Sequence, residues 1–175
     1  TIQSSEKIIQ FDLKLFKKIA VIGFGKATAK MAKAVEEVLL GRINSGLISV
    51  KYGHTEDLSV IETIEAGHPI PDSNSEAAAQ RILSNATEYK SDTLVLVLIS
   101  GGGSALVSSP YDSSNSKIQI NLQDKQEISK LLLKCGASIQ EINCIRKHLS
   151  LIKGGRLAHA LYPATTISLI LSDVI

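Results

Sequence analysis

Apolar residues along the chain alternate between two kinds of pattern. Short β-branched runs predict five buried strands at 19–24, 46–50, 60–64, 93–99 and 165–171. Between and after them, apolar residues at helical spacing predict helices over 27–40, 76–89, 123–135, 138–149 and 155–161. Ser73 and Ser75 are candidate N-caps of the second helix, and the polar tract at 108–116 predicts a surface loop. The order predicts a doubly wound, Rossmann-like α/β fold, with a mostly parallel sheet and helices on both faces.

Composition narrows the class of protein. With 175 residues, 44% of them hydrophobic and 21% charged, the chain fits one globular domain. A net charge of +2, no Trp and few aromatic residues argue against a nucleic-acid surface. Cys135 and Cys144 fit reduced thiols, and no apolar run is long enough to span a bilayer. We therefore expect a cytoplasmic protein without a membrane partner, and the sequence leaves a homo-oligomer open.

The strand at 93–99 runs directly into three glycines flanked by serines. Three glycines cost the folded state about 2–3 kcal/mol relative to Ala, so they need a compensating role. Without Cβ atoms their N–H groups can close on an anion, and a following helix would add positive partial charge. The segment predicts a phosphate site made by Ser100, Gly101, Gly102, Gly103 and Ser104. The alternative is a tight strand–helix turn with no ligand.

A second glycine turn, Gly23-Phe-Gly-Lys-Ala-Thr28, follows the first strand. A dinucleotide-binding fold would carry Gly or Ala at position 28 and a ribose-binding acid about 20 residues further on, but this chain has Thr28 and Lys51, so the turn fits that fold poorly. Its glycine spacing also differs from that of a Walker A loop. Lys26 lies at the carboxyl end of the strand, and two interpretations are open: it binds phosphate, or it is a solvated surface residue. The segment Gly67-His-Pro-Ile-Pro-Asp72 is equally open: a site with His68 and Asp72, or a connection in which Asp72 caps the next helix.

Basic residues gather in the segment 141–155. Asn143, Arg146 and Lys147 fall on neighbouring helical turns, and Lys153 precedes another glycine turn. This pattern predicts a patch for an acidic small molecule, with a solvated helix face as the alternative. The four histidines show no ligand spacing, so we expect no zinc site built by protein side chains.

These motifs together resemble the glycerate 2-kinases of the MOFRL type. The segments that carry the resemblance are 23–27, 31–32, 67–72, 100–105, 124–126, 136–158 and 171–174. The resemblance implies phosphorylation of the 2-hydroxyl of glycerate to 2-phosphoglycerate, with ATP and Mg²⁺. It also implies that Lys26 is catalytic, that Asp173 is a catalytic acid or a metal ligand, and that residues 100–104 bind nucleotide phosphates. Asn143, Arg146 and Lys153 are then candidate glycerate-binding residues.

Members of that family continue beyond the Ser-Asp-Val motif into a second domain, whereas this sequence ends at Ile175. We therefore expect residues 1–175 to form a single α/β domain, the N-terminal part of such an enzyme, with negligible turnover alone. The alternative function is a sugar-phosphate-binding module of the sugar-isomerase type, which needs no nucleotide. The turn at 23–28 and the block 136–158 favour the kinase, and Thr28 and Lys51 weaken a third reading as a nicotinamide dehydrogenase.

Overall fold

The computed structural model of the chain describes residues 2–3, 8–110 and 120–172. Its centre is a five-stranded sheet made of β3 (Lys18–Phe24), β4 (Ser45–Lys51), β5 (Ile61–Ala66), β6 (Thr93–Ser100) and β7 (Thr165–Leu171). The strand order is β5-β4-β3-β6-β7, and every neighbouring pair is parallel. The order reverses between β3 and β6, which is the crevice where doubly wound sheets bind ligands. The predicted fold class is confirmed.

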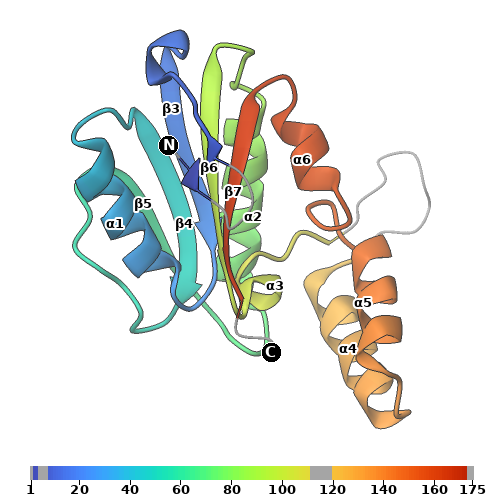
Figure 1. The fold of residues 1–175 in the computed structure, drawn as a ribbon. Helices are drawn as coiled ribbons and strands as arrows, with labels where there is room; N and C mark the ends of the chain where they lie inside the picture. Colours follow the sequence, from blue (N-terminus) through green and yellow to red (C-terminus); the bar gives the residue numbers. More distant parts are fainter. Residues whose placement is uncertain (1, 4–7, 111–119, 173–175) are drawn as a thin grey trace.

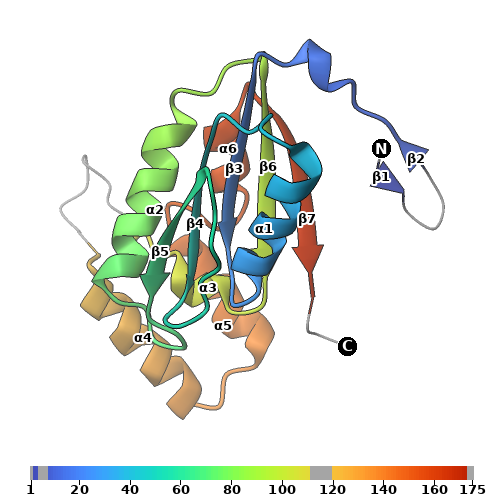
Figure 2. The ribbon, with the colours of Figure 1, turned by 90° about the vertical axis from the view of Figure 1, so that its left-hand side faces the viewer.

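Helices cover both faces of the sheet and gather at one end of it. They are α1 (Thr28–Leu39), α2 (Ser73–Ala86), α3 (Gly103–Leu106), α4 (Leu122–Lys134), α5 (Ile139–His148) and α6 (Arg156–Leu161). One face carries α1 and the opposite face carries α2 and α6 (Figures 1 and 2). The short α3 and the α4–α5 pair lie at the carboxyl end of the strands (Figure 1). None of these helices, which are all that the described residues form, is long and apolar enough to cross a bilayer.

Alternating side chains of the central strand build two separate cores. Ile22 of β3 is fully buried on the face covered by α2, where it belongs to the same cluster as Ile82. Val21 points to the other face and belongs to the cluster that contains Ala29 and Ala32 of α1. The alanines let the helix backbone approach the sheet closely. Burial on both faces explains why the sequence shows continuous apolar runs rather than alternation.

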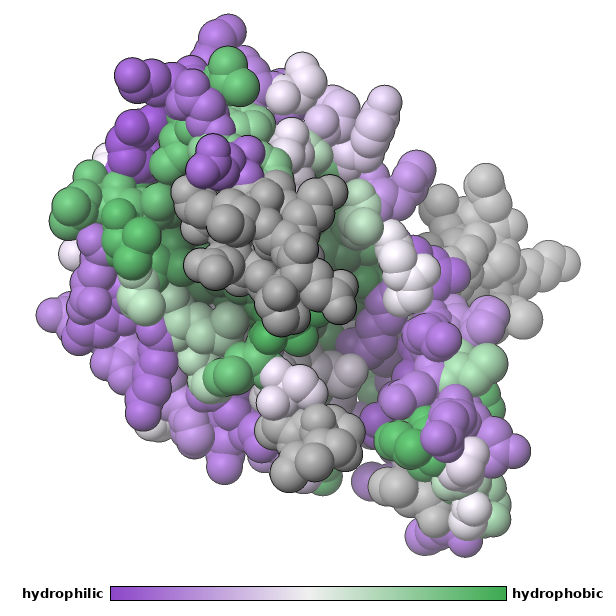
Figure 3. Space-filling model, viewed as in Figure 1, coloured by the Kyte–Doolittle hydropathy of each residue, from purple (hydrophilic) through white to green (hydrophobic). Residues whose placement is uncertain are grey.

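The face that carries α1 also presents apolar side chains at the surface. A groove of about 490 Å³ runs between α1, which contributes Met31 and Val38, and the edge of the sheet, which contributes Ile167 and Leu169 of β7. Figure 3 shows apolar residues gathered on this side of the molecule. The apolar core therefore reaches the surface beside the edge strand.

Four short elements at the start of the chain and after β6 were not predicted, or predicted only in outline. The N-terminal part forms a two-stranded ribbon of β1 (Ile2–Gln3) and β2 (Ile8–Ile9) and a single 3₁₀ turn, Leu13–Leu15. A helix was expected after the triple glycine, and α3 is that helix, but it has only four residues. The part of the polar loop at 111–116 lies outside the described residues.

The start of α2 differs from the sequence prediction. The helix begins at Ser73, three residues early, because Asp72 rather than Ser73 or Ser75 is the N-cap. The Asp72 carboxylate accepts a hydrogen bond from the N–H of Ser75 at 3.0 Å, and the Ser75 hydroxyl closes the reciprocal half of a capping box. The bond from the Tyr52 hydroxyl to Asp72, at 2.8 Å, holds the carboxylate in place. A capping role for Asp72, one of the two alternatives above, is therefore established by geometry.

This cap predicts a graded effect on stability. Asp72→Ala removes the acceptor and should lower the free energy of unfolding by about 1 kcal/mol, within a range of about 0.5–2 kcal/mol, whereas Asp72→Asn keeps a capping oxygen and should lose clearly less. Urea denaturation of the two variants, compared with the parent, measures the difference. Equal losses in both variants would show that the carboxylate acts through something other than the cap.

Candidate functional site

The two glycine turns predicted from the sequence meet at the switch point of the sheet. The N–H of Lys26 donates to the carbonyl of Gly101 at 2.9 Å. The hydroxyl of Ser100 accepts a hydrogen bond from the N–H of Ala27 at 3.1 Å and shares another with the Thr28 hydroxyl at 3.0 Å. Ser100 is almost fully buried, so its side chain connects the end of β6 to the start of α1. In this arrangement the Ser100 hydroxyl holds the two turns together, and its predicted contact with phosphate stays a prediction.

Close packing explains why these turns contain glycine. A Cβ on Gly102 would lie 2.8 Å from the His68 ring and 3.3 Å from Cγ of Lys26, and its φ of +87° is one that side chains disfavour. A Cβ on Gly103 would lie 2.6 Å from the Phe24 ring. His68 and Lys26 therefore pack against the side of Gly102 where a Cβ would stand, and only glycine allows this close approach.

The glycine loop has backbone N–H groups that are available to donate hydrogen bonds to a ligand. Within the described residues, the N–H groups of Gly102, Gly103 and Ser104 donate no hydrogen bond. Because α3 has only four residues, its dipole adds less positive charge than the sequence prediction assumed. Three neighbouring amides with unused donors are nevertheless a feature that binds anions elsewhere.

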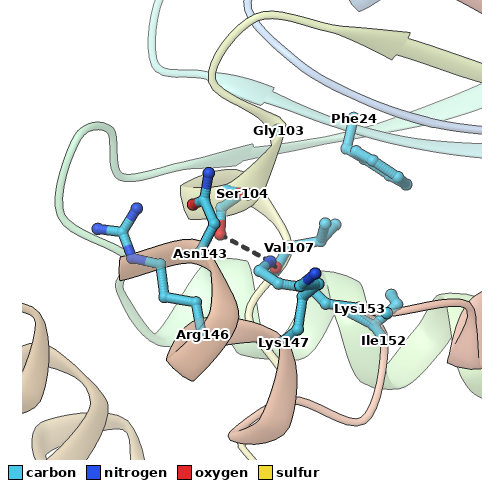
Figure 4. A pocket seen from close by; sticks show the side chains of 10 residues that line it. Phe24, Gly103, Ser104, Val107, Asn143, Arg146, Lys147, Ile152 and Lys153 are labelled. Atoms are coloured by element: carbon cyan, nitrogen blue, oxygen red, sulfur yellow. Dashed lines mark hydrogen bonds between the residues drawn. The ribbon is translucent and has the colours of Figure 1, made fainter. Parts of the chain in front are cut away.

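A cavity with two lobes opens beside this loop. The larger lobe, of about 460 Å³, lies between Phe24 of β3 and the basic side of α5, which presents Asn143, Arg146 and Lys147 (Figure 4). The smaller lobe, of about 270 Å³, is lined by the 67–72 segment and by α4. The residues common to both lobes are Ser104, Arg146 and Lys153.

Two lysines of this cavity, Lys125 and Lys153, have lowered pKa values. Lys153 donates to the carbonyls of Ser104 and Val107, at 3.0 and 3.2 Å, and so links the turn after α5 to α3 (Figure 4). Burial, together with the charges of Lys125 and Arg146, lowers the pKa of Lys153 to about 7. Lys125 donates to the buried hydroxyl of Ser108 at 2.9 Å. Burial and the charge of Arg146 lower the pKa of Lys125 to about 8, although the charge of Glu76 acts to raise it.

His68 lies at the junction of the cavity and the glycine loop. Burial lowers its pKa, and the positive charges of Lys26 and Lys51 lower it further. The imidazole is therefore neutral at pH 7 and can accept or donate a single proton. The neighbouring Asp72 is different: burial would raise its pKa, but hydrogen bonds from Gly67, Ser75 and Tyr52 hold it below its usual value.

The positions of the predicted site residues can now be compared. The structure brings Lys26, Ser104, Asn143, Arg146 and Lys153 together with the glycine loop at one end of the sheet. Asp173 lies outside the described residues, so its predicted role stays a prediction. Lys125 reaches the cavity from α4, although no site role was predicted for it. The available signals were its place in the segment 124–126, which carries part of the family resemblance, and its position on the partly buried side of an amphipathic helix.

Acidic side chains are absent from the lining of both lobes within the described residues. The same residues contain no cluster of three His, Cys, Asp or Glu side chains able to hold a metal ion. The charged side chains that line the described part of the site are therefore basic.

The chain is similar in sequence to several known proteins. D-glycerate 2-kinase of Thermotoga maritima is 42% identical over 159 residues, which are 90% of this chain and 37% of the relative. Glycerate 2-kinase of Pyrococcus horikoshii is 43% identical over 176 residues, covering 98% of this chain and 38% of the relative. A protein of Agrobacterium vitis, provisionally named as a hydroxypyruvate reductase, is 45% identical over 157 residues, with coverages of 90% and 39%. The chain thus spans less than two fifths of the length of these curated relatives.

Solved structures agree on the fold. A crystal structure of a protein from Pyrococcus horikoshii superposes with a TM-score of 0.85 and 44% identity, over 94% of this chain and 35% of that one. The crystal structure of a glycerate kinase from Thermotoga maritima gives a TM-score of 0.83 and 42% identity, over 93% and 38%. Residues 1–175 also match, along their whole length, the family described as a domain of unknown function, DUF4147. The chain therefore belongs to the DUF4147 family, and the resemblance to glycerate 2-kinases read from its motifs is confirmed.

Proposed function

We propose that this chain is the phosphate-binding part of an ATP-dependent glycerate 2-kinase, which phosphorylates the 2-hydroxyl of glycerate to give 2-phosphoglycerate. The observation that supports this best is the position of the triple glycine. Its unused amides face a cavity with three cationic side chains, Lys125, Arg146 and Lys153, in a chain related to named glycerate kinases. Phosphoryl transfer needs mainly positioning and stabilisation of charge, and these groups supply both.

The residues of this chain have distinct tasks in the proposed reaction. The amides of Gly102, Gly103 and Ser104 bind phosphate oxygens, and glycine is required because the backbone itself must approach the anion. The Lys26 side chain packs against Gly102 and stabilises the charge that spreads over the transferred phosphoryl group. His68, which also packs against Gly102, is placed to orient or accept the proton of the attacking hydroxyl.

The cavity suits the phosphates of a nucleotide, because amides that donate no hydrogen bond in the described residues lie at its lining and the surrounding charges are positive. ATP, when bound, supplies the phosphoryl group. The described residues do not offer a comparable fit for Mg²⁺, since no carboxylate lines either lobe. We therefore derive no step through the metal, and the metal-binding or catalytic role of Asp173 stays a prediction.

One observation argues against the reductase name carried by a relative. In a nicotinamide-binding fold the strand next to the first one ends in an acid that binds the ribose. Here that strand is β4, and it ends at Lys51. The turn after β3 also has Thr28 where the fingerprint requires a small residue. The same turn and the basic cavity favour a kinase over the sugar-phosphate-binding alternative.

The reaction itself can be tested in a protein of the relatives' full length that contains this chain. We expect ATP-dependent consumption of glycerate and a ³¹P spectrum of 2-phosphoglycerate. A product phosphorylated at the 3-hydroxyl would contradict the assigned position. Reduction of hydroxypyruvate by a nicotinamide cofactor, without kinase turnover, would contradict the proposed function altogether.

Lys26 gives the first prediction in that full-length protein. Lys26→Met keeps the apolar stem but removes the charge, so turnover should fall by about 100- to 1,000-fold. The melting temperature should barely change, and Lys26→Arg should restore little because a planar fork does not replace a compact charge. Lys30→Met, at an exposed position on α1, is the matched control and should behave like the parent. A parallel loss of turnover and stability would show that Lys26 is structural.

Lys153 gives a prediction about pH. A pKa of about 7 means that Lys153 gains its charge as the pH falls, so the cavity should bind a dianion more tightly at about pH 6 than at about pH 9. Sulfate is a suitable probe because it does not titrate in this range. The lowered pKa of His68 keeps its titration toward the acid end of this range, while Lys125 contributes a second change near pH 8.

Calorimetric titration with sulfate measures this dependence. In Lys153→Met the change near pH 7 should disappear and that near pH 8 should remain, with binding about 10-fold weaker or more at low pH. Lys134→Met, which removes an exposed lysine of α4, should leave the profile unchanged. A profile that is flat in the parent chain would contradict the assignment.

A further inference from the structure

The smaller lobe of the cavity contains a cation, Lys125, that has no individual task in the reaction proposed above. Lys125 reaches this lobe from α4 and donates to the hydroxyl of Ser108, which is 1% exposed. Its neighbour Gln126 donates to the carbonyl of Pro71 at 2.7 Å and so fixes α4 against the 67–72 segment. The ammonium group of Lys125 is therefore held in position by contacts on both sides of the helix.

The cations of this lobe have unused donors. An ammonium group has three N–H bonds, of which Lys125 uses one and Lys153 uses two in the described residues. The guanidinium group of Arg146 makes no hydrogen bond there. No carboxylate lines the lobe within the described residues, and Glu76, which acts on Lys125 from outside the lining, offsets only part of the three charges. Partly buried cations in such a place favour a ligand that is an anion.

The smaller and the larger lobe differ in volume, and therefore in the size of ligand that each can hold. Pockets that take drug-sized ligands measure about 300–1,000 Å³. The larger lobe, at about 460 Å³, falls in this range, and the smaller one, at about 270 Å³, falls below it. The smaller lobe therefore suits a small acid rather than a nucleotide.

The two ends of the lobe differ in chemistry. Gly102 and Ser108 flank α3 on opposite sides, so His68 and the glycine loop lie near one end and Lys125 near the other. A small hydroxy acid bound along α3 would direct its hydroxyl toward the glycine loop and its carboxylate toward Lys125. The reverse orientation would put the carboxylate beside the phosphate-binding amides, where it would repel the transferred group.

We infer that the smaller lobe binds the acceptor, and that Lys125 is the specificity-determining residue that recognises its carboxylate. This inference rests on the proposed kinase function. It assigns a role in substrate choice to a residue outside the glycine loops and outside the basic face of α5.

Kinetics in the full-length protein test the inference. Lys125→Met should raise KM for glycerate by about 10- to 100-fold, the effect of losing one charged hydrogen bond, while kcat and KM for ATP change by less than about threefold. KM for glycerol, which has the hydroxyls but no carboxylate, should not change. The preference for glycerate over glycerol should therefore fall by the same factor. Lys130→Met, on the exposed side of the same helix, is the matched control.

Several outcomes would overturn the inference. If Lys125→Met raises KM for ATP rather than for glycerate, the residue belongs to the nucleotide site; if it raises KM for glycerol equally, it does not read the carboxylate. If the variant loses stability, Lys125→Arg separates the two effects, because it restores the charge and should recover most of the glycerate affinity. Failure of the proposed function looks different, since the parent protein would then show no glycerate phosphorylation. Calorimetric titration with glycerate, without nucleotide, should show the same loss of affinity in Lys125→Met.

Discussion

The hydrogen bonds of the Ser100 hydroxyl are the interaction on which the candidate site depends. They join the end of β6 to the first turn of α1, and the carbonyl of Gly101 accepts the N–H of Lys26 in the same contact. Such a junction forms only where two parallel strands end side by side and no Cβ intervenes. Any side chain at Gly25 would collide with Ser100, and its φ of +142° is one that only glycine adopts easily. The cost of these glycines is thus offset by an edge at which backbone amides and a lysine lie together.

The second feature of the site is positive charge without an acidic partner. Lys125, Arg146 and Lys153 come from two helices and a turn that the fold brings against α3, and burial lowers the pKa of both lysines. Such an arrangement is unfavourable in the free protein, because each charge is partly desolvated and repels the others. An anion that binds only the folded state relieves that repulsion and stabilises the fold by mass action. The same three cations therefore lower the stability of the fold when the cavity is empty and raise it when an anion is bound.

Much of the fold could be predicted because its signals are local. The strand at 165–171 was predicted at its exact bounds, and the others within one or two residues, because buried parallel strands leave continuous apolar runs. The start of α2 was missed because Ser73 and Ser75 compete with Asp72 as caps, and only the bonds from Ser75 and Tyr52 decide between them. The hydrogen bonds of Ser100 to the first turn of α1 were not predicted, because a hydroxyl after a strand carries no sign of its tertiary partner. Lys125 lies in the segment 124–126 that carries part of the resemblance, but no site role was predicted for it, since Ser108 contacts it, and Pro71 contacts its neighbour Gln126, only in the folded chain.

The central claim is that the triple glycine binds phosphate through its own amides. The most direct measurement is a titration of the ¹⁵N-labelled chain with ATP, followed by amide chemical shifts. The account predicts that the resonances of Gly102, Gly103 and Ser104 move most and saturate together, with smaller changes at Lys26 and Lys153. Saturable binding that moves other resonances, such as those along the apolar groove beside β7, and leaves the three loop amides unchanged would contradict it.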